Sequence, residues 1–170
     1  MKKIKPYILP ICLILVLSLS RIIPHPSNFT PILATGVFAG FYFRNFILSL
    51  FIVIISMFIG DLILGFHSTM LFTYASLIIS VAIGFYIKKL RFIEVLFSGI
   101  ASSVGFFIIT NFGAWLTIEM YEKNFSGLIQ SYIMAIPFFH NTLISTILYL
   151  IILKLILDFF EKKKIIKNSF

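Results

Sequence analysis

The chain has 170 residues, of which 60% are hydrophobic and only 12% are charged. A soluble domain of this size cannot hide that much apolar surface, because too many of its residues must face water. This composition excludes an ordinary soluble domain and predicts a membrane protein whose outer surface is solvated by lipid. The net charge of +8 does not indicate nucleic-acid binding, because the basic residues form short clusters between apolar runs.

The apolar runs predict an all-α bundle of about six transmembrane helices, in a single integral membrane domain over residues 1–170. The runs are apolar all round, as is typical of helices embedded in lipid. The second run is short for a hydrocarbon core about 30 Å thick, at a rise of 1.5 Å per residue. In chain order, the expected helices span residues 7–23, 31–43, 46–65, 69–87, 92–112 and 140–160.

A shorter apolar run, residues 127–136, has two interpretations. Pro137 follows it directly, and a proline inside a helix removes a hydrogen bond and kinks the backbone. The run is therefore either an outer interfacial or re-entrant helix, or the kinked beginning of the last helix.

The distribution of lysine and arginine predicts the orientation of the bundle. If the N-terminus is in the cytoplasm, only Arg21 and Lys123 of the 14 basic residues lie outside. The positive-inside rule therefore predicts a multi-pass protein of the cytoplasmic (inner) membrane with both termini in the cytoplasm. The residues then expected on the cytoplasmic side are Lys2, Lys3, Lys5, Arg44, Lys88, Lys89, Arg91, Lys154, Lys162, Lys163, Lys164 and Lys167.

This orientation gathers the unusual polar residues, including all three histidines, on the outer side. A charge near the edge of an apolar helix is costly unless it is paired or wet, so such residues are candidates for function. We expect a substrate-binding site on the outer side. Its candidate residues are Arg21, His25, Asn28, Asp61, His67, Asn111, Trp115, His140 and Asn141.

Several of these residues also have structural interpretations. Arg21 and Asp61 form either part of the site or a pair that pins the first helix to the third, and both roles are compatible. His25 lies between two prolines, which hold it on a stiff segment suited to ligand contact or simply separate two helices. Trp115 belongs either to the interfacial belt or to a platform for a flat ligand.

Metal and catalytic chemistry have little support in the sequence. Imidazole suits zinc, cobalt and nickel, but no His-x-x-x-His or Glu-x-x-His pair occurs on one helix. The single cysteine, Cys12, excludes a cysteine-based metal site. We find no Gly-x-Ser-x-Gly, no His-Glu-x-x-His and no phosphate-binding loop. We therefore expect no metal, no cofactor and no enzymatic activity.

Gly36 and Gly40 form a G-x-x-x-G spacing in the short second run. Small residues at this spacing allow two helices to approach closely. The expected neighbour is either another helix of the same fold or a partner subunit.

Four strings carry a resemblance to a known group of proteins. They are R-I-I-P-H-P-S-N-F-T-P (21–31), D-L-I-L-G-F-H-S-T-M (61–70), T-N-F-G-A-W (110–115) and I-P-F-F-H-N-T-L (136–143). The chain resembles an uncharacterised family of small bacterial six-helix membrane proteins over nearly its whole length. That family carries no established activity.

In architecture the chain also resembles the S components of ECF-type vitamin transporters. These six-helix proteins capture a vitamin or metal from outside with loops one, three and five, the loops that carry the unusual polar residues here. The resemblance implies uptake of a micronutrient and docking on an energising transporter subunit. Many S components dock through an Ala-x-x-x-Ala face on the first helix, and residues 7–20 contain no alanine. This departure from the pattern leaves two alternatives, a solitary transporter or docking through Gly36 and Gly40.

The sequence thus leads to one main hypothesis and one rival. The main hypothesis is S-component-like binding and uptake of a small polar or amphipathic solute, within a membrane lipid environment. The rival is a non-transporting membrane scaffold or assembly protein that binds a protein or lipid headgroup. The first predicts that the candidate side chains converge on an outer pocket. The second predicts a flat polar surface and a Gly36 face exposed to a partner.

Overall fold

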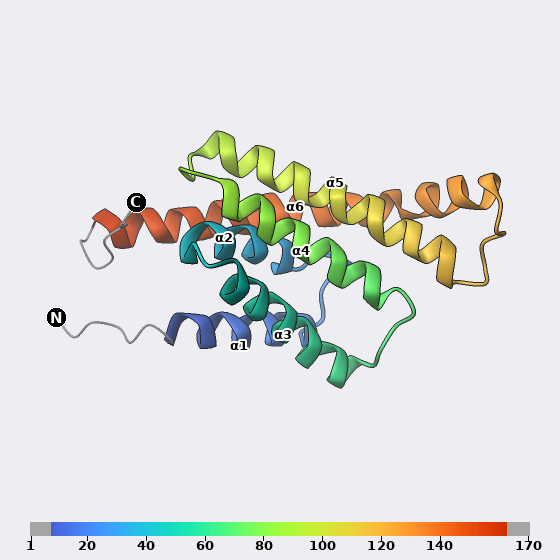
Figure 1. The fold of residues 1–170 in the computed structure, drawn as a ribbon, viewed down its shortest axis with the longest axis horizontal. Coiled ribbons are helices and arrows are strands. Elements are labelled where there is room, and N and C mark those ends of the chain that lie inside the picture. The colour runs from blue at the N-terminus through green and yellow to red at the C-terminus, as the bar shows by residue number, and fades with distance from the viewer. Residues whose placement is uncertain (1–7, 163–170) are drawn as a thin grey trace.

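The computed structural model describes residues 8–162, which form six α-helices and no strand. The prediction of an all-α bundle is therefore confirmed for this part of the chain. Figure 1 shows the helices running roughly along one long axis, with α5 and α6 side by side. The helices are α1 (Ile8–Ile22), α2 (Ile32–Phe43), α3 (Phe46–Leu64), α4 (Met70–Tyr86), α5 (Phe92–Thr117) and α6 (Phe125–Lys162).

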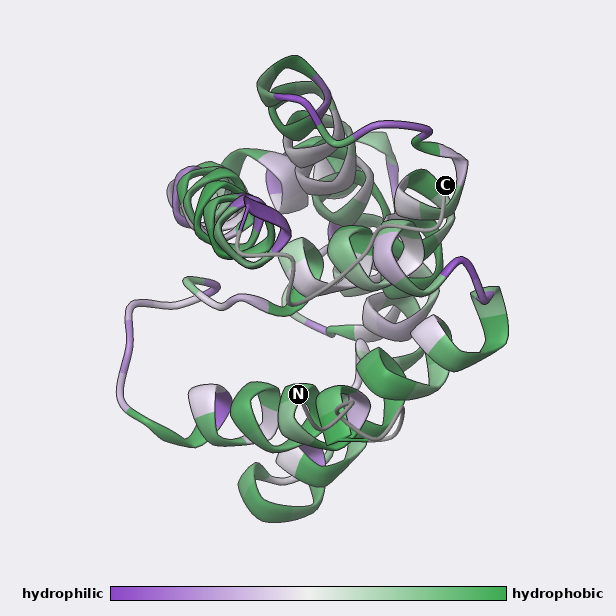
Figure 2. Cartoon of the chain, turned by 90° about the vertical axis from the view of Figure 1, so that its left-hand side faces the viewer, coloured by the Kyte–Doolittle hydropathy of each residue, from purple (hydrophilic) through white to green (hydrophobic). Residues whose placement is uncertain are grey.

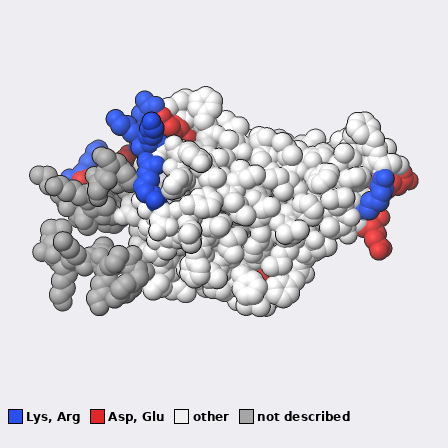
Figure 3. All heavy atoms as spheres, in the orientation of Figure 1, with Lys and Arg blue, Asp and Glu red and all other residues white. Residues whose placement is uncertain are grey.

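The surface of the bundle suits a membrane. By length and composition α3, α5 and α6 are able to cross one, whereas α1, α2 and α4 are shorter apolar helices. Large apolar side chains face outward, such as Ile47 (79% exposed) and Leu71 (75% exposed). Hydrophilic residues lie mainly in connections and at helix ends (Figure 2). The face seen in Figure 3 carries most of its charged groups at the two ends, with one small acidic spot between them. So much exposed apolar surface needs lipid around it, so this is a membrane protein.

The connections between helices group toward two ends of the bundle (Figure 1). We call one the basic end: it contains connections 44–45 and 87–91, the start of α1 and the end of α6. Connections 23–31, 65–69 and 118–124 lie toward the opposite end, which we call the loop end. The predicted cytoplasmic residues Lys2, Lys3, Lys5, Lys163, Lys164 and Lys167 lie outside the described residues.

The shortest helix, α2, lies in the centre of the bundle. It contacts α3, α4, α5 and α6, and ten of its 12 residues are buried. Twelve residues rise only about 18 Å, which is less than the roughly 30 Å of a hydrocarbon core. Helix α2 is therefore an internal element that the other helices surround, and α1, at the edge, packs mainly on α3.

Glycines bring α2 and α4 into close contact. A Cβ atom added at Gly36 would lie 2.3 Å from Ser80 Oγ, and one at Gly40 would lie 2.3 Å from a backbone oxygen of α4. From the other side, a Cβ at Gly84 would lie 1.9 Å from the carbonyl oxygen of Val37. The Gly36–Gly40 face therefore packs inside the fold, and the alternative of a partner subunit on this face is wrong.

Helix α5 continues to Thr117, beyond the predicted end at residue 112. The prediction ended this helix just before Gly113, but the glycine lies buried inside the helix. A Cβ there would lie 2.2 Å from Cγ of Phe72 on α4. Close packing against Phe72 therefore outweighs the weak helix propensity of glycine.

Helix α6 is one continuous helix of 38 residues with Pro137 inside it. Residues 127–136 are thus the beginning of the last helix and not a separate interfacial or re-entrant element. Hydrogen bonds tie this part of α6 to α5: Ser131 Oγ donates to the carbonyl of Asn111, and Tyr132 Oη donates to that of Ile108. These contacts fix the part of α6 before Pro137 against α5.

Candidate functional site

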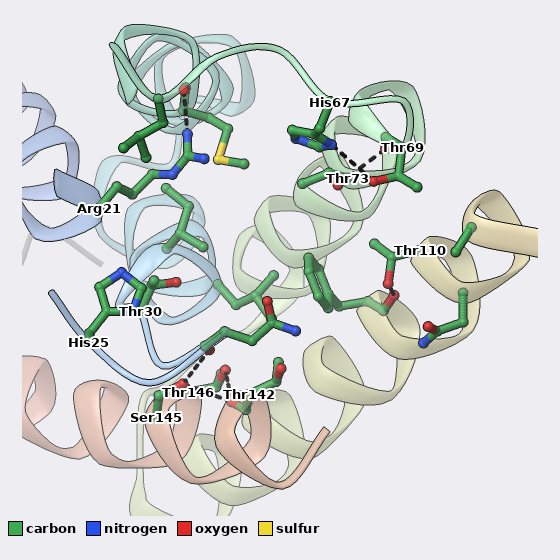
Figure 4. A pocket seen from close by; sticks show the side chains of 18 of the residues that line it. Arg21, His25, Thr30, His67, Thr69, Thr73, Thr110, Thr142, Ser145 and Thr146 are labelled. Carbon is green, nitrogen blue, oxygen red and sulfur yellow. Dashed lines mark hydrogen bonds between the residues drawn. The ribbon is translucent and has the colours of Figure 1, made fainter. Parts of the chain in front are cut away.

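At the loop end the protein contains a cavity of about 440 Å³ (Figure 4). Its walls come from the last turn of α1, connections 23–31 and 65–69, and all five other helices. The volume lies in the range of small-molecule sites, about 300–1,000 Å³. Five of the nine predicted site residues line it: Arg21, His25, Asn28, His67 and Asn111.

Arg21 reaches the cavity from the last turn of α1 and is held from behind by Asp61. The two side chains form an ion pair, with 2.7 Å between Arg21 Nη1 and Asp61 Oδ1. The same Nη1 donates to the carbonyl of Met57 at 2.7 Å, and Tyr74 Oη donates to Asp61 Oδ2 at 2.7 Å. The side chain of Asp61 is 0% exposed, against 14% for Arg21. Asp61 does not line the cavity, so its role is to hold Arg21.

The Arg21–Asp61 pair confirms the structural interpretation of these two charges, that they join α1 to α3. Tyr74 adds α4 to the same network. The guanidinium packs tightly against α3, because a Cβ at Gly60 would lie 2.6 Å from Arg21 Nη1. A buried carboxylate of this kind is tolerated only while its partners stay in place.

Connection 23–31 carries His25 and Asn28 over the cavity. His25 Nδ1 lies 2.8 Å from the carbonyl oxygen of Pro26. Since a carbonyl only accepts, Nδ1 is the donor of this hydrogen bond. Asn28 has a φ of 62°, in the left-handed region that asparagine tolerates better than most residues. The connection thus contributes the side chains of His25 and Asn28 to the cavity, and its backbone turns at Asn28.

Two hydrogen bonds fasten this connection to α6. Asn141 Nδ2 donates to the carbonyl of Ser27 at 3.0 Å, and Ser145 Oγ donates to that of Asn28 at 3.4 Å. Asn141 does not itself line the cavity, so the structure makes it a tether for the connection and not a direct contact.

The opposite wall carries His67 and Asn111. His67 Nδ1 lies 2.9 Å from Thr69 Oγ1 (Figure 4). Asn111 Nδ2 donates to the carbonyl of Phe107 at 2.7 Å, which leaves its side-chain oxygen as an acceptor. Neither His25 nor His67 has a hydrogen bond to a carboxylate within residues 8–162.

Trp115 and His140 were also predicted at the site, and neither lines the cavity. Trp115 Nε1 donates to the carbonyl of Glu122 at 2.9 Å, and Lys123 Nζ donates to that of Trp115. These two bonds join the end of α5 to the connection that follows it. His140 is exposed on α6 beside Phe139. Both predictions assumed that membership of an outer loop brings a residue to one site, whereas each side chain turns away from the cavity.

The sequence reasoning missed a set of hydroxyl groups. Four of the threonines donate to the carbonyl four residues earlier in their own helix, so they fit an apolar run without a tertiary partner. Their oxygens still accept hydrogen bonds from a ligand. The one pattern in the sequence is their recurrence at a spacing of four. The hydroxyl residues of the lining are Thr30, Thr69, Thr73, Thr110, Thr142, Ser145 and Thr146.

A small cavity of about 50 Å³ adjoins the main one and shares Asn28, Phe106, Thr110, Asn111 and Thr142 with it. Its other lining residues are Phe107 of α5 and Ala135, Phe138 and Phe139 of α6. The site therefore combines a polar chamber with a narrow aromatic extension. Across residues 8–162, no three His, Cys, Asp or Glu side chains come together as a metal-binding group.

Comparison with known proteins gives a family and no activity. No curated protein and no solved structure matches the chain. Residues 2–167 match the family described as "Family of unknown function (DUF6580)". Because this match covers nearly the whole sequence, the chain belongs to the DUF6580 family.

Proposed function

We propose that the protein binds a small polar or amphipathic solute in the cavity at the loop end and serves its uptake, as an S component does. The observation that carries this proposal is a cavity of about 440 Å³ that gathers twelve polar residues among apolar ones, at one end of an otherwise apolar bundle. Polar groups inside a membrane bundle are costly, so a chamber lined with them is a candidate for ligand binding.

The composition of the lining supports a solute with both polar and apolar parts. Hydroxyl, amide and imidazole groups come from several separate elements and face one chamber (Figure 4). Leu33, Met57 and Phe106 supply apolar wall between them. A few polar groups in a mainly apolar pocket are typical of small-molecule sites, where the polar groups fix orientation.

The charge distribution supports capture from outside the cell. Within residues 8–162, connection 87–91 at the basic end carries Lys88, Lys89 and Arg91. Under the positive-inside rule, these charges support an orientation with the basic end in the cytoplasm. The cavity lies toward the opposite end, where a solute arriving from outside reaches it first.

The rival role, a membrane scaffold, loses its main support. It required the Gly36–Gly40 face to be free for a partner, and α4 covers that face. It also required the polar residues to lie on a flat surface, whereas five of the predicted ones line a cavity.

Native mass spectrometry of protein purified gently from its own membrane tests the proposal. We expect a defined small molecule on the wild type, and its loss in Ala114→Phe, which fills the cavity from α5. The control is Ile108→Phe on the same helix, at a position that is 51% exposed and outside the lining. An empty wild type, or one that carries only lipid or another polypeptide, would refute uptake.

Cysteine labelling tests the orientation independently. Cys12 is replaced by serine, and a single cysteine is introduced as Ser27→Cys at the loop end or Lys89→Cys at the basic end. Both positions are exposed. We expect a membrane-impermeant maleimide to label the first in intact cells and the second only after permeabilisation. The reverse pattern would rule out capture from outside.

A further inference from the structure

We infer that the solute is an organic anion and that Arg21 binds its acid group, a carboxylate or a phosphate. This inference rests on the proposed function and narrows it, because that function alone leaves the charge of the solute open. Three observations carry it: the charges of the lining, the free side of the Arg21 guanidinium, and the way this guanidinium is held.

The lining has basic and neutral groups but no acidic one. Its titratable side chains are Arg21, His25 and His67. The carboxylate nearest to this set, Asp61, is completely buried behind Arg21, with its oxygens facing Arg21 and Tyr74. The guanidinium therefore stands between the carboxylate and the chamber, and a ligand meets the positive end of the pair. This arrangement favours an anion.

The guanidinium has an unused binding side. Its Nη1 is occupied by Asp61 and the carbonyl of Met57. Neither Nε nor Nη2 has a partner within residues 8–162. These two atoms form the side of the guanidinium that matches a carboxylate or phosphate with two parallel hydrogen bonds. Figure 4 shows the side chain extending from α1 toward the chamber.

The guanidinium is also fixed before any ligand arrives. The Asp61 ion pair, the Met57 carbonyl and the close approach to Gly60 determine its position. Little side-chain entropy therefore remains to be lost on binding, which raises the affinity for an acid group. A pair with a purely structural role would not need to leave the Nε–Nη2 side free at a cavity.

The rest of the chamber fits the body of such a solute. Leu33 and Phe106 offer an apolar wall, and Asn28 and Asn111 offer amide groups. An anion with an apolar or aromatic body and one further polar group would contact Arg21, the apolar wall and the amide groups at the same time.

The test compares three forms of the full-length protein in detergent: wild type, Arg21→Met/Asp61→Leu and Arg91→Met/Glu94→Leu. The first double variant removes both charges together, because removal of one leaves the other buried and unpaired. The second removes an exposed arginine–carboxylate pair at the basic end and is the matched control. Each form is exposed to the small-molecule extract of the source cells and washed, and the retained compounds are identified by mass spectrometry.

We expect the wild type and the control to retain a compound with a carboxylate or phosphate. The Arg21→Met/Asp61→Leu variant should bind it about 10- to 100-fold more weakly, as measured by calorimetry with the isolated compound. The neutral amide or alcohol form of the compound should lose similar affinity for the wild type and should not distinguish the wild type from this variant. Arg21→Lys keeps the charge but lacks the two parallel donors, so it should bind the compound with intermediate affinity. Melting curves of all forms show whether each variant is folded.

Each outcome tests the anion inference, the proposed uptake function, or both. A retained neutral solute overturns the anion inference and leaves the proposed function standing. An anion that the Arg21→Met/Asp61→Leu variant binds as tightly as the wild type overturns the role of Arg21. An anionic phospholipid that only this variant loses supports the anion site, assigns its source to a lipid headgroup and refutes solute uptake. Retention of no compound by any form overturns both proposals.

Discussion

The two ends of the bundle are built on opposite principles, although the same helices form both. At the basic end, α2 and α4 touch backbone to backbone at Gly40 and Gly84. Arg44 covers the end of α4, where its guanidinium donates to the carbonyls of Phe85 at 3.0 Å and Lys88 at 3.1 Å. At the loop end, Leu33 of α2 and Thr73 of α4 face a cavity. The first end is closed by contact and the second is kept open.

The two ends differ in which residues of α2 and α4 face each other. Both α2 and α4 begin at the loop end and finish at the basic end. Gly40 and Gly84 bring the helices together near the basic end, whereas Leu33 of α2 and Thr73 of α4 line the cavity near the loop end. Connection 23–31 adds His25, Asn28 and Thr30 to the lining.

The largest expected effect comes from breaking the buried charge pair at the loop end. Arg21→Met alone leaves the Asp61 carboxylate buried without its cation. Loss of one partner of such a pair costs about 3–5 kcal/mol of unfolding free energy. We expect this loss in denaturant titrations of the detergent-solubilised protein, and recovery of most of it in Arg21→Met/Asp61→Leu.

The control for this variant is the exposed Arg91–Glu94 pair. Arg91 is exposed at the basic end beside Glu94, where water and salt screen the charges. Arg91→Met should therefore leave the unfolding transition unchanged. If Arg21→Met proved equally harmless, the view of Asp61 as a buried charge held by Arg21 would be wrong.

A smaller effect is expected from the close contact at the basic end. Gly84→Ala places a methyl group on the backbone of Val37, and overpacking of this kind costs about 1–3 kcal/mol. Gly105→Ala is the matched control, because its nearest neighbour would be a side-chain atom of Ile79 at 3.7 Å, an ordinary contact. There, alanine should stabilise the helix slightly through its better propensity. Equal melting temperatures for the two variants would contradict a basic end closed by contact.

The fold was largely predictable because apolar length and charge clusters are local properties of the sequence. They gave the all-α class, and helix bounds close to those observed for the first four helices. The errors lie where tertiary contacts override a local rule. Helix α5 continues past its predicted end at residue 112, where Gly113 packs against Phe72. Helix α6 begins at Phe125, which agrees with the alternative in which residues 127–136 begin the last helix, and Ser131 and Tyr132 bond this part to α5.

The site was predictable only in part, because loop membership says little about where a side chain points. Arg21 and Asp61 were recognised from the cost of charge in an apolar run, and the structure pairs them. Trp115 and His140 lie on the predicted outer side but turn away from the cavity. The lining threonines were missed because a hydroxyl bonded to its own helix gives an apolar run no visible interruption.

The smallest expected effect concerns connection 23–31, which forms part of the cavity lining. Asn141→Ala removes the hydrogen bond to the carbonyl of Ser27, which should cost about 0.5–1.5 kcal/mol. Hydrogen exchange should report this locally, as faster exchange in connection 23–31 with little change in the helices. His140→Ala, one residue earlier on the same helix, removes a side chain that neither lines the cavity nor bonds to the connection. It should leave exchange unchanged. Faster exchange in the His140 variant alone would reverse the roles assigned to these neighbours. The expected result would make the loop end the more easily opened one, since a few hydrogen bonds close it while backbone contacts close the basic end.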